Sequence, residues 1–531
     1  MSSRSPQPRS WRREEHPLSA LLQVLAIGLV MAAAVFFWVR YANGRSARAT
    51  ARVDAQTLLR SGNAGELRQA TERLEALLQD APQDGEARLL LARAHTDLFR
   101  LHGDEASGQA VDRVLEAGPL DDPQDAIAER MLIHLARGDA EGARRLLSSH
   151  GDAPRGQRLA FAEAELLRAE GALAEAGQRL ERVLRGSREA PAMLLAAASL
   201  ALDDGRVGLA RRHLTRGKTL APDHRGLQLM DALIQAREGS VPEGADALAA
   251  QVLGAKKAEA SVREMSQAHA LLAYRDLLEG KADAARKRAE EGLKVDPRGL
   301  AAAEVRARAL LAQKDPAAAE AFLAAQKLRP TSRLVALDAA ELLTGNGQLD
   351  VAERILEVYA STFRPITIED REGRTTPALD ADGRYWLARG KLLVAQDRGD
   401  EALAALDRSI GVRGLEQAEA LWVKSRLLVD RDDPTRAREV LAQVTPEDGS
   451  GPLPGAYRTM GELLFAARDW QRGAMHYGFA LGGLLNRGAP RDEAEALRQE
   501  VAERLRASQQ PRLAQAWLEE TRALVAPPTD T

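Results

Sequence analysis

The sequence contains no cysteine. That absence excludes disulfides, cysteine-ligated zinc and thiol catalysis, and it leaves the redox compartment open, since a cysteine-free chain suits oxidising and reducing spaces alike. Aromatic residues are also scarce, at 4% of the 531 residues. Neither sign of charge dominates, because acids and bases are mixed along the chain and the net charge is −3. No long basic face is expected, so nucleic acid is not a favoured partner.

Motifs that carry catalysis are missing too. The chain has no HExxH, no GxSxG and no GxxxxGK[ST]. The stretch from Asp380 to Asp382 faintly resembles a calcium loop, but its glycine comes two places early and the twelfth position is Lys391 rather than glutamate. The nine histidines are scattered, and a lone one such as His134 or His213 is more often a packing residue than a ligand. We therefore expect no enzyme activity, no cofactor, no metal and no small-molecule substrate.

What the chain does contain is a repeated spacing. A glycine is followed five residues later by an alanine at six places, and several of these glycines recur at about 34 residues or twice that distance. A period of this length is typical of a solenoid built from helix–turn–helix units. The six pairs are Gly65/Ala70, Gly138/Ala143, Gly171/Ala176, Gly205/Ala210, Gly280/Ala285 and Gly347/Ala352.

Each repeated position has a physical role. The glycine is expected to end the first helix of a unit, where a left-handed backbone conformation costs a residue without Cβ little. The alanine lies in the second helix, where a small side chain allows two helices to approach closely. Proline cannot continue a helix, so it closes the unit twelve residues after the alanine at Pro82, Pro222 and Pro297.

This arrangement resembles the tetratricopeptide repeat (TPR) family. One unit keeps the register of the family consensus at Trp386, Gly390, Leu393, Ala402 and Leu406. We count about thirteen units between residues 51 and 527, some of them degenerate. The predicted fold is all-α: a right-handed superhelical solenoid of TPR-like repeats, preceded by one transmembrane helix. The alternatives are an irregular helical domain and a HEAT-type array, whose period is longer.

The predicted transmembrane helix spans Leu18 to Val39, a stretch without a charged residue. As a helix it would be about 33 Å long, against about 30 Å of bilayer hydrocarbon, and Trp38 and Tyr41 stand at one end, where interfacial aromatics belong. A cleaved signal peptide and a buried core helix are the alternatives, but the stretch exceeds the usual apolar length of a signal. The lipid bilayer is therefore an expected partner through residues 18–39.

The flanking arginines say almost nothing about which end of this helix lies in the cytoplasm. Four precede it and four follow it, so the positive-inside rule barely discriminates. A short arginine-rich tail is difficult to export, whereas a long domain translocates largely regardless of charge. The Ala, Arg, Gly and Leu bias is typical of GC-rich bacterial genomes. We expect a single-pass protein of a bacterial inner membrane with the repeats in the periplasm, and a cytoplasmic array remains the alternative.

The chain is expected to divide at changes of pattern. A polar, proline-containing stretch without helical period interrupts the repeats, and such loops either carry binding or are tolerated insertions. The predicted segments are a basic tail (1–17), the transmembrane helix (18–39), a juxtamembrane linker (40–50), a solenoid (51–365), a long polar loop (366–382), further repeats (383–525) and a disordered tail (526–531).

The resemblance implies that the first helix of each unit lines a concave groove for other proteins. On that mapping Arg384, Lys391, Arg458 and Glu462 would face the groove. Family members that grip chaperone tails need a groove asparagine, and asparagine stands only at linker, turn or loop positions, so that role is not expected. The predicted function is a membrane-anchored scaffold that recruits partner proteins. A cytoplasmic docking platform and a self-associating structural subunit of an envelope complex are the alternatives.

Overall fold

The computed structural model describes most of the chain. The described residues are 17–150, 156–186, 190–255, 260–362, 367–369, 375–377, 379–412, 414 and 416–525. Within the first helix, the side chains of residues 17–24, 37 and 39–44 are not described. Residues 1–16 of the predicted basic tail (1–17) and the whole of the predicted disordered tail (526–531) therefore lie outside the described residues.

The described chain folds into successive helical pairs. The first nine are α1 (Pro17–Ser61) with α2 (Ala64–Asp80), α3 (Gly85–His102) with α4 (Glu105–Glu116), α5 (Pro123–Ala136) with α6 (Ala140–His150), α7 (Gln157–Ala169) with α8 (Leu173–Gly186), α9 (Pro191–Asp203) with α10 (Val207–Leu220), α11 (Arg225–Arg237) with α12 (Ala245–Gly254), α13 (Val262–Leu278) with α14 (Ala282–Val295), α15 (Leu300–Ala312) with α16 (Ala318–Leu328), and α17 (Arg333–Gly345) with α18 (Leu349–Thr362).

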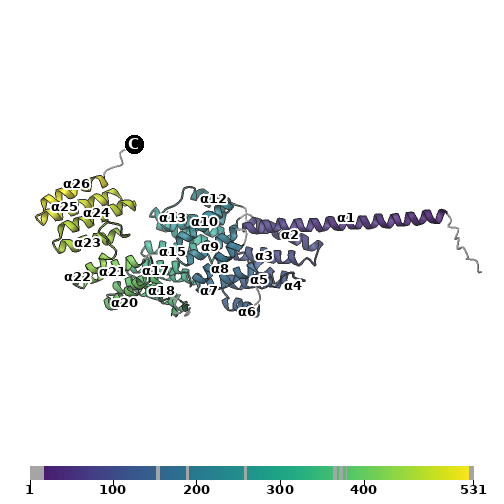
Figure 1. Ribbon diagram of the computed structural model, residues 1–531, viewed down its shortest axis with the longest axis horizontal. Helices are drawn as coiled ribbons and strands as arrows, with labels where there is room; N and C mark the ends of the chain where they lie inside the picture. The colour runs from purple at the N-terminus through teal and green to yellow at the C-terminus, as the bar shows by residue number, and fades with distance from the viewer. Residues whose placement is uncertain are drawn as a thin grey trace, which may run out of the picture.

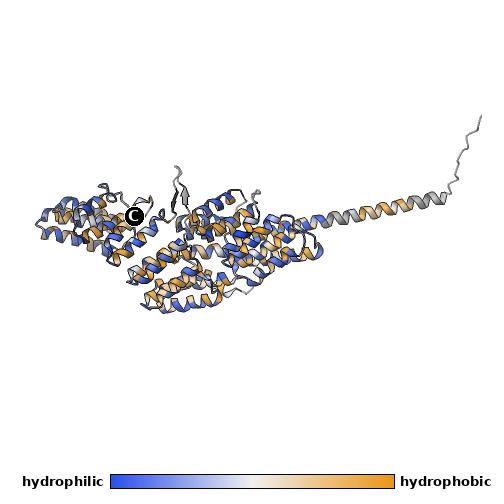
Figure 2. Ribbon diagram, turned by 90° about the horizontal axis from the view of Figure 1, so that it is seen from below, coloured by the Kyte–Doolittle hydropathy of each residue, from blue (hydrophilic) through white to orange (hydrophobic). Residues whose placement is uncertain are grey.

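Four further pairs follow a short β-hairpin. They are α19 (Gly383–Ala395) with α20 (Gly399–Gly411), α21 (Glu416–Asp430) with α22 (Pro434–Ala442), α23 (Pro454–Ala466) with α24 (Trp470–Asn486), and α25 (Arg491–Ala507) with α26 (Pro511–Glu520), which α27 (Arg522–Val525) follows. The pairs stack into an elongated array, and α1 projects from one end of it as a long rod (Figure 1). Figure 2, which views the molecule from below, shows the same projection, with apolar residues along the rod.

Local sequence explains where these helices begin and end. Side-chain caps start several of the first helices: the Asp84 carboxylate accepts a hydrogen bond from the amide of Ala87 at 3.0 Å, and Ser261 and Glu264 form a reciprocal capping box. Five of the six predicted glycines have φ between +73° and +85°, in the left-handed region that ends a helix. These are Gly138, Gly171, Gly205, Gly280 and Gly347.

The prediction for Gly65 is wrong. Gly65 lies inside α2, and the residue that ends α1 with φ +74° is Gly62. The sequence Gly62-Asn63-Ala64-Gly65 offers two glycines to one turn, and the first of them takes the left-handed position because Asn63 adopts the extended conformation of a helix N-cap. The alanine predicted together with Gly65, Ala70, is nevertheless fully buried like the other five repeated alanines.

The three repeat-closing prolines stand just outside the second helices of their units. Helices α2, α10 and α14 end at Asp80, Leu220 and Val295, and in each case the proline is the second residue after the end. They are Pro82, Pro222 and Pro297. Because proline lacks the amide hydrogen that a further turn of helix needs, the chain reverses here into the next unit.

The repeated alanines are packing residues without contact to solvent, and neighbouring helices touch at them. Each has 0% of its surface exposed, so none can take part in binding directly; the six are Ala70, Ala143, Ala176, Ala210, Ala285 and Ala352. In four of the units the residue twelve places earlier is a buried alanine as well: Ala164, Ala198, Ala273 and Ala340. Two small side chains facing each other allow the close crossing of the pair.

Large apolar side chains fill the space between pairs. The core runs continuously from α15 to α21 through Phe322, Tyr359, Trp386 and Leu406. Each pair buries its apolar face against the next one, so further clusters of buried apolar residues follow one another along the rest of the described array.

Two predicted boundaries differ from the structure. Residues 40–50, predicted as a linker, belong to the continuous helix α1, since this Ala- and Arg-rich stretch contains no residue that breaks a helix strongly. Within the predicted loop 366–382, β1 (Thr367–Glu369) and β2 (Thr375–Pro377) pair antiparallel. A three-residue strand is too short to leave a periodic signal in the sequence. Residues 366, 370–374 and 378 of that loop lie outside the described residues.

The predicted transmembrane segment is described only in part, because the side chains of 18–24, 37 and 39 lie outside the description. Among the residues that the structure describes, no helix carries an apolar stretch long enough to cross a bilayer.

The array curves until distant pairs touch. Helix α9 packs against α1 and α17, and α3 packs against α13. At one of these contacts the turn at Gly62 lies so close to α9 that a Cβ added there would come within 2.6 Å of the Ala192 Cβ. At another, an Arg329 guanidinium nitrogen lies 3.0 Å from an Asp203 carboxylate oxygen. The first nine pairs therefore hold one another across the curve as well as along it.

Candidate functional site

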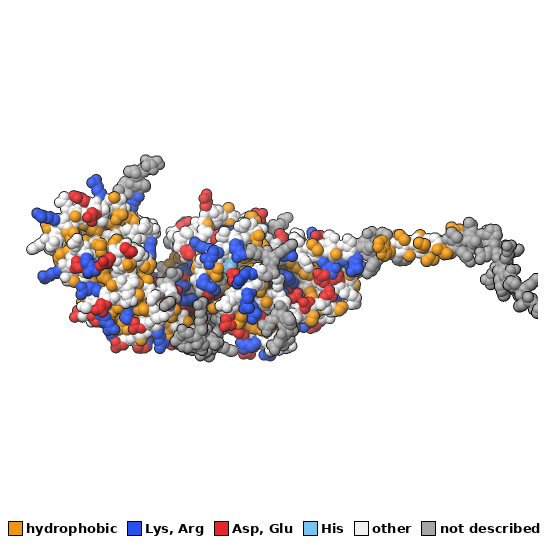
Figure 3. All heavy atoms as spheres, viewed as in Figure 1, with side chains coloured by type: hydrophobic (Ala, Val, Ile, Leu, Met, Phe, Trp, Pro, Cys, Tyr) orange, Lys and Arg blue, Asp and Glu red, His pale blue; other side chains and the backbone are white. Residues whose placement is uncertain are grey.

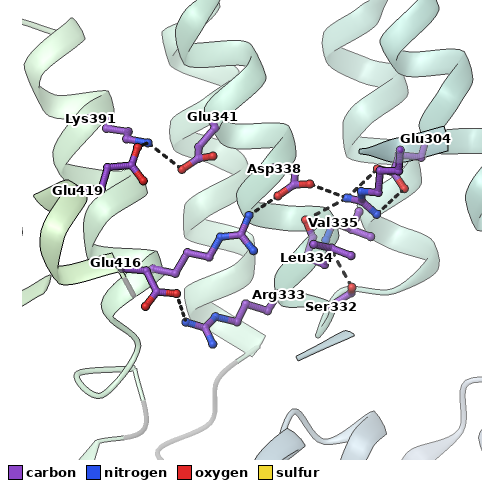
Figure 4. A network of polar contacts seen from close by, with 12 residues as sticks. Glu304, Ser332, Arg333, Leu334, Val335, Asp338, Glu341, Lys391, Glu416 and Glu419 are labelled. Carbon is purple, nitrogen blue, oxygen red and sulfur yellow. Dashed lines mark hydrogen bonds and ion pairs between the residues drawn. The ribbon is translucent and has the colours of Figure 1, made fainter. Parts of the chain in front are cut away.

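Charged side chains from five first helices form three neighbouring groups of ion pairs, which together we call the α11–α21 network. Figure 4 shows most of it, with residues of α15, α17, α19 and α21 pointing toward one another. First helices repeat at a fixed spacing, so their middle turns lie side by side and their side chains can pair from one unit to the next. The members of the network are Arg237, Glu304, Arg308, Arg333, Asp338, Glu341, Arg384, Lys391, Glu416 and Glu419.

Asp338 on α17 is the centre of one half of the network. One of its carboxylate oxygens lies 2.8 Å from an Arg237 nitrogen, and the other pairs with Arg384. Arg237 also contacts Glu304 at 2.8 Å, and Arg308 lies 3.2 Å from the same glutamate. One carboxylate thus ties together helices α11, α17 and α19.

Lys391 on α19 is the centre of the other half. Its ammonium nitrogen lies 3.2 Å from the Glu341 carboxylate of α17 and 2.6 Å from the Glu419 carboxylate of α21. A single cation between two carboxylates leaves this part of the surface with a net negative charge.

Arg333 at the start of α17 links the network to the start of α19. It donates to the Asp382 carboxylate at 2.5 Å, and its side chain lies 4.0 Å from Glu416. Asp382 also caps α19 and accepts a hydrogen bond from the Tyr359 hydroxyl at 2.8 Å. The aspartate that the sequence places in a faint calcium-loop pattern is thus used as a helix cap and an ion-pair partner.

Two cations of the network, Arg237 and Lys391, keep their charge at neutral pH. Burial opposes the charge on Arg237, but Glu304 and Asp338 outweigh it and raise the pKa of the guanidinium. Burial likewise opposes the charge on Lys391, and Glu341 with Glu419 raises the pKa of its ammonium above the usual value. Burial and then Asp382 raise the pKa of Tyr359 well above its usual value, so its hydroxyl stays a donor.

A recess of about 420 Å³ opens beside the network. Asp338, Glu341 and Arg308 supply its charged wall, and Leu342, Gly345 and Asn346 complete the lining. Gly345 adds no side chain, and no atom lies within 4 Å of the place its Cβ would occupy. A side chain of another polypeptide has room here, beside charges of both signs.

Two of the four predicted groove residues belong to this site. Arg384 and Lys391 are both members of the network, and their side chains are about one-fifth to one-quarter exposed. Arg458 and Glu462 are not: both lie on α23, where Arg458 contacts Glu462 at 3.5 Å and Glu500 of α25 at 3.2 Å. The four residues therefore belong to two separate sets of ion pairs.

Sequence reasoning missed the acidic half of the network, although a signal was present. Glu341 directly follows Ala340, the small residue twelve places before Ala352. Lys391 directly follows Gly390, the small residue twelve places before Ala402. Charges of opposite sign at the same position of successive units predict a pair. Asp338 and Glu304 stand at different repeat positions, so spacing could not have found them.

The described residues contain no group of three or more histidine, aspartate or glutamate side chains placed to hold a metal ion. Successive helical hairpins at the repeat spacing, with buried alanines at their crossings, define the class of the fold as a TPR-like helical solenoid.

Comparisons with known proteins add the following. No family model matches the chain, and no curated protein matches it. Among solved structures, the chain is similar to one in the APC/C hetero-tetramer Cut9–Hcn1, with 11% identity, a TM-score of 0.35 and coverage of 82% of this chain and 93% of that one. It is also similar to a chain in the structure of Naa15/Naa10 bound to HypK-THB, with 14% identity, a TM-score of 0.37 and coverage of 86% and 87%. MamA from Desulfovibrio magneticus RS-1 matches at 17% identity and a TM-score of 0.26, over 34% of this chain and 92% of that one.

Proposed function

We propose that this protein is a scaffold that holds partner proteins in the recess beside the α11–α21 network. The observation that carries the proposal is the recess itself, because it adjoins fixed charges of both signs on the first helices of the array. A polypeptide can fill such a space with one side chain and satisfy the surrounding charges with others.

Site-specific photo-crosslinking in cells tests this proposal. A benzophenone amino acid is placed at Asn346 in the recess and, as a matched control, at Asp350, which is exposed on α18 of the same pair. We expect discrete crosslinked adducts from position 346 that are absent from position 350. The same adduct pattern at both positions would mean that the recess has no special role.

Reversing the charge of Glu341 tests whether the network is needed for the crosslinks from position 346. Glu341→Lys changes the recess wall, whereas Glu357→Lys makes the same charge change at an exposed position of α18. The adducts from position 346 should weaken strongly with the first variant and persist with the second. Equal effects of both variants would assign the adducts to overall charge rather than to the recess.

We also propose that the N-terminal part of α1 anchors the protein in a bilayer. The sequence 18–39 has no charged residue, and its described apolar side chains, such as Leu29 at 74% and Trp38 at 69%, are exposed along the rod. Apolar side chains exposed on every side of a helix are unfavourable in water and favourable in lipid. Alkaline carbonate extraction of cell membranes tests this: the full chain should stay with the membrane pellet and a chain without residues 18–39 should not.

The side of the membrane is a further part of the proposal. A tail with four arginines resists export, which favours a periplasmic array at a bacterial inner membrane. A C-terminal reporter that is active only outside the cytoplasm should then show activity, and one that fluoresces only inside should stay dark. The reverse result would place the array in the cytoplasm.

A further inference from the structure

A second recess lies on a different part of the array, between α8, α9 and α10, and has a volume of about 510 Å³. Much of its lining is small or apolar: Ala174 and Gly177 come from α8, Ala197 and Ala201 from α9. Leu200 and Leu209 also reach its wall. Small residues on two helices leave space that a larger pair would fill, so the recess has room for an apolar side chain.

Basic side chains surround this recess. Arg182, Arg185 and Arg206 line it, and Arg212 is exposed on α10 next to His213. Helix α10 contains no acidic residue at all. Figure 3 has the same view as Figure 1. It shows Lys and Arg side chains over the middle of the array, in the region where Figure 1 labels α8 to α10.

Of the two carboxylates in the lining, Asp204 is paired with an arginine and Glu181 lies beside the His213 ring, whereas several of the described arginines have no carboxylate partner. Glu181 lies 3.3 Å from the His213 Nε2, and Asp204 lies 2.5 Å from Arg206. Among the described residues, Arg182 and Arg185 hydrogen-bond only to carbonyls of their own helix, at 3.4 Å, and neither these two nor Arg212 has a carboxylate partner. The rim therefore carries unneutralised positive charge.

One buried polar group in the lining also lacks a partner. His213 has only 5% of its side chain exposed, and its Nδ1 accepts no hydrogen bond in the described part of the chain. Burial lowers the pKa of His213, so the ring is neutral at neutral pH. Since Nε2 lies 3.3 Å from the Glu181 carboxylate, we place the ring proton on Nε2, which makes Nδ1 the acceptor nitrogen. A donor on an occupant of the recess would supply the missing bond.

From this combination we infer that the α8–α10 recess binds an acidic polypeptide segment that places one apolar side chain in the recess and its carboxylates on the surrounding arginines. The positive charge of the rim favours an acidic polypeptide segment over other occupants of the recess. A nucleic acid needs a basic face that follows its backbone over several phosphates, and a membrane needs apolar groups that protrude, whereas this site is a single concave space with cations at its rim. Arginine is also the residue best suited to paired hydrogen bonds with carboxylates.

A peptide array on the full chain in detergent tests the proposal. Heptapeptides carry a central Gly, Ala, Leu or Phe flanked on each side by three Glu, three Gln or three Lys. We expect binding to the Glu-flanked peptides with Leu or Phe, and little binding to the Gln-flanked or Lys-flanked sets. Preference for Lys, or equal binding whatever the central residue, would overturn the proposal, as would no binding at peptide concentrations of about 1 mM.

Variants then locate the binding site by fluorescence anisotropy with the Glu-flanked Leu peptide. Arg182→Glu with Arg185→Glu should weaken binding about tenfold or more, because close charge pairs at interfaces carry that much coupling. Gly177→Leu should weaken it by filling the recess. An added Cβ there meets only the end of the flexible Arg206 side chain, at 3.0 Å, so the fold tolerates it.

The matched control is Arg436→Glu with Arg522→Glu, which makes the same charge change at exposed positions of α22 and α27. It should leave binding unchanged, and far-UV circular dichroism should show equal helicity for all variants. Equal loss in control and test variants, or tighter binding of a labelled oligonucleotide than of the peptide, would contradict the proposal. Because the site is separate from the α11–α21 network, failure here leaves the crosslinking result at position 346 intact.

Discussion

At the scale of the residue, the turns inside the helical pairs show how one backbone angle is met by different amino acids. Glycine fills the left-handed position at Gly138, Gly171, Gly205, Gly280 and Gly347, whereas other pairs use Lys314, Asp397, Asp432, Arg468 and Gln509 at φ between +57° and +65°. Residues with a Cβ lose about 1–2 kcal/mol in this conformation. The turn geometry is therefore set by the packing of the pair, and glycine only reduces the strain.

Substitutions at these left-handed positions should therefore change the stability of the array in opposite directions. Gly205→Ala should destabilise the array by about 1 kcal/mol, because φ is +73° there, while Arg468→Gly should stabilise it by up to about 1 kcal/mol. Thermal unfolding followed by circular dichroism should show a lower midpoint for the first variant and a higher one for the second. Shifts of the same sign would argue against backbone strain as the cause.

The buried alanines give a second residue-scale prediction. Ala210 has no exposed surface at the crossing of α9 and α10, so Ala210→Leu should overpack that crossing and cost about 1–3 kcal/mol. The control is Ala106→Leu, because Ala106 is exposed on α4 and a leucine there meets solvent. Urea denaturation should separate the two variants clearly, and an unchanged midpoint for Ala210→Leu would contradict the assigned register.

At the scale of the element, two histidines lie buried where distant helices meet. His102 ends α3 and donates from Nε2 to the Gly62 carbonyl at 2.7 Å, while His224 caps α11 next to the same turn. Burial lowers the pKa of both rings, partly offset by Glu264, and Arg263 lowers the pKa of His102 further. Both rings are therefore neutral at neutral pH.

The stability of this junction should depend on pH. Because the folded pKa values lie below that of an unfolded histidine, about 6.5, the unfolded chain binds protons first as the pH falls. The stabilisation that the two neutral rings provide is fully present above about pH 6.5. It is lost progressively as the pH falls from there toward the folded pKa values. The unfolding midpoint should drop between about pH 7.5 and 5.5, and His102→Gln should flatten that slope. An equal slope in the original chain and in His102→Gln would contradict this account.

The elements also show what the sequence could and could not predict. The glycine–alanine spacing predicted the helical pairs, because close crossings demand small residues at fixed intervals. It missed the β1–β2 hairpin and assigned Gly65 to a turn that Gly62 makes. For the candidate site, Arg384 and Lys391 could be named from their repeat positions. Asp338 pairs with Arg237 of the distant helix α11 only through the curvature of the array, which no local pattern encodes.

At the scale of the whole molecule, the rod of α1 and the array behave as separable parts. The exposed apolar side chains of the rod, from Leu25 to Trp38, precede the first buried residue of the array, Ala55. Removing residues 1–41 should therefore give a helical, monodisperse and elongated fragment. Small-angle scattering and size-exclusion chromatography check this, and aggregation or a globular scattering profile would contradict the solenoid.

The shape of that fragment should depend on a few contacts across the curve. Arg329, just after α16, reaches Asp203 and Ser199 of α9 at 3.0 and 3.1 Å, and Arg298 donates to the Ala136 carbonyl of α5 at 3.4 Å. These bonds join pairs far apart in the sequence, so they set curvature rather than the stability of any single pair. Arg329→Ala with Arg298→Ala in the 42–531 fragment should raise the radius of gyration while helicity stays constant. Arg354→Ala, which removes an exposed pair with Glu320 between neighbouring second helices, is the control and should leave the radius unchanged. An equal radius for all three proteins would mean that packing of adjacent pairs alone fixes the curve.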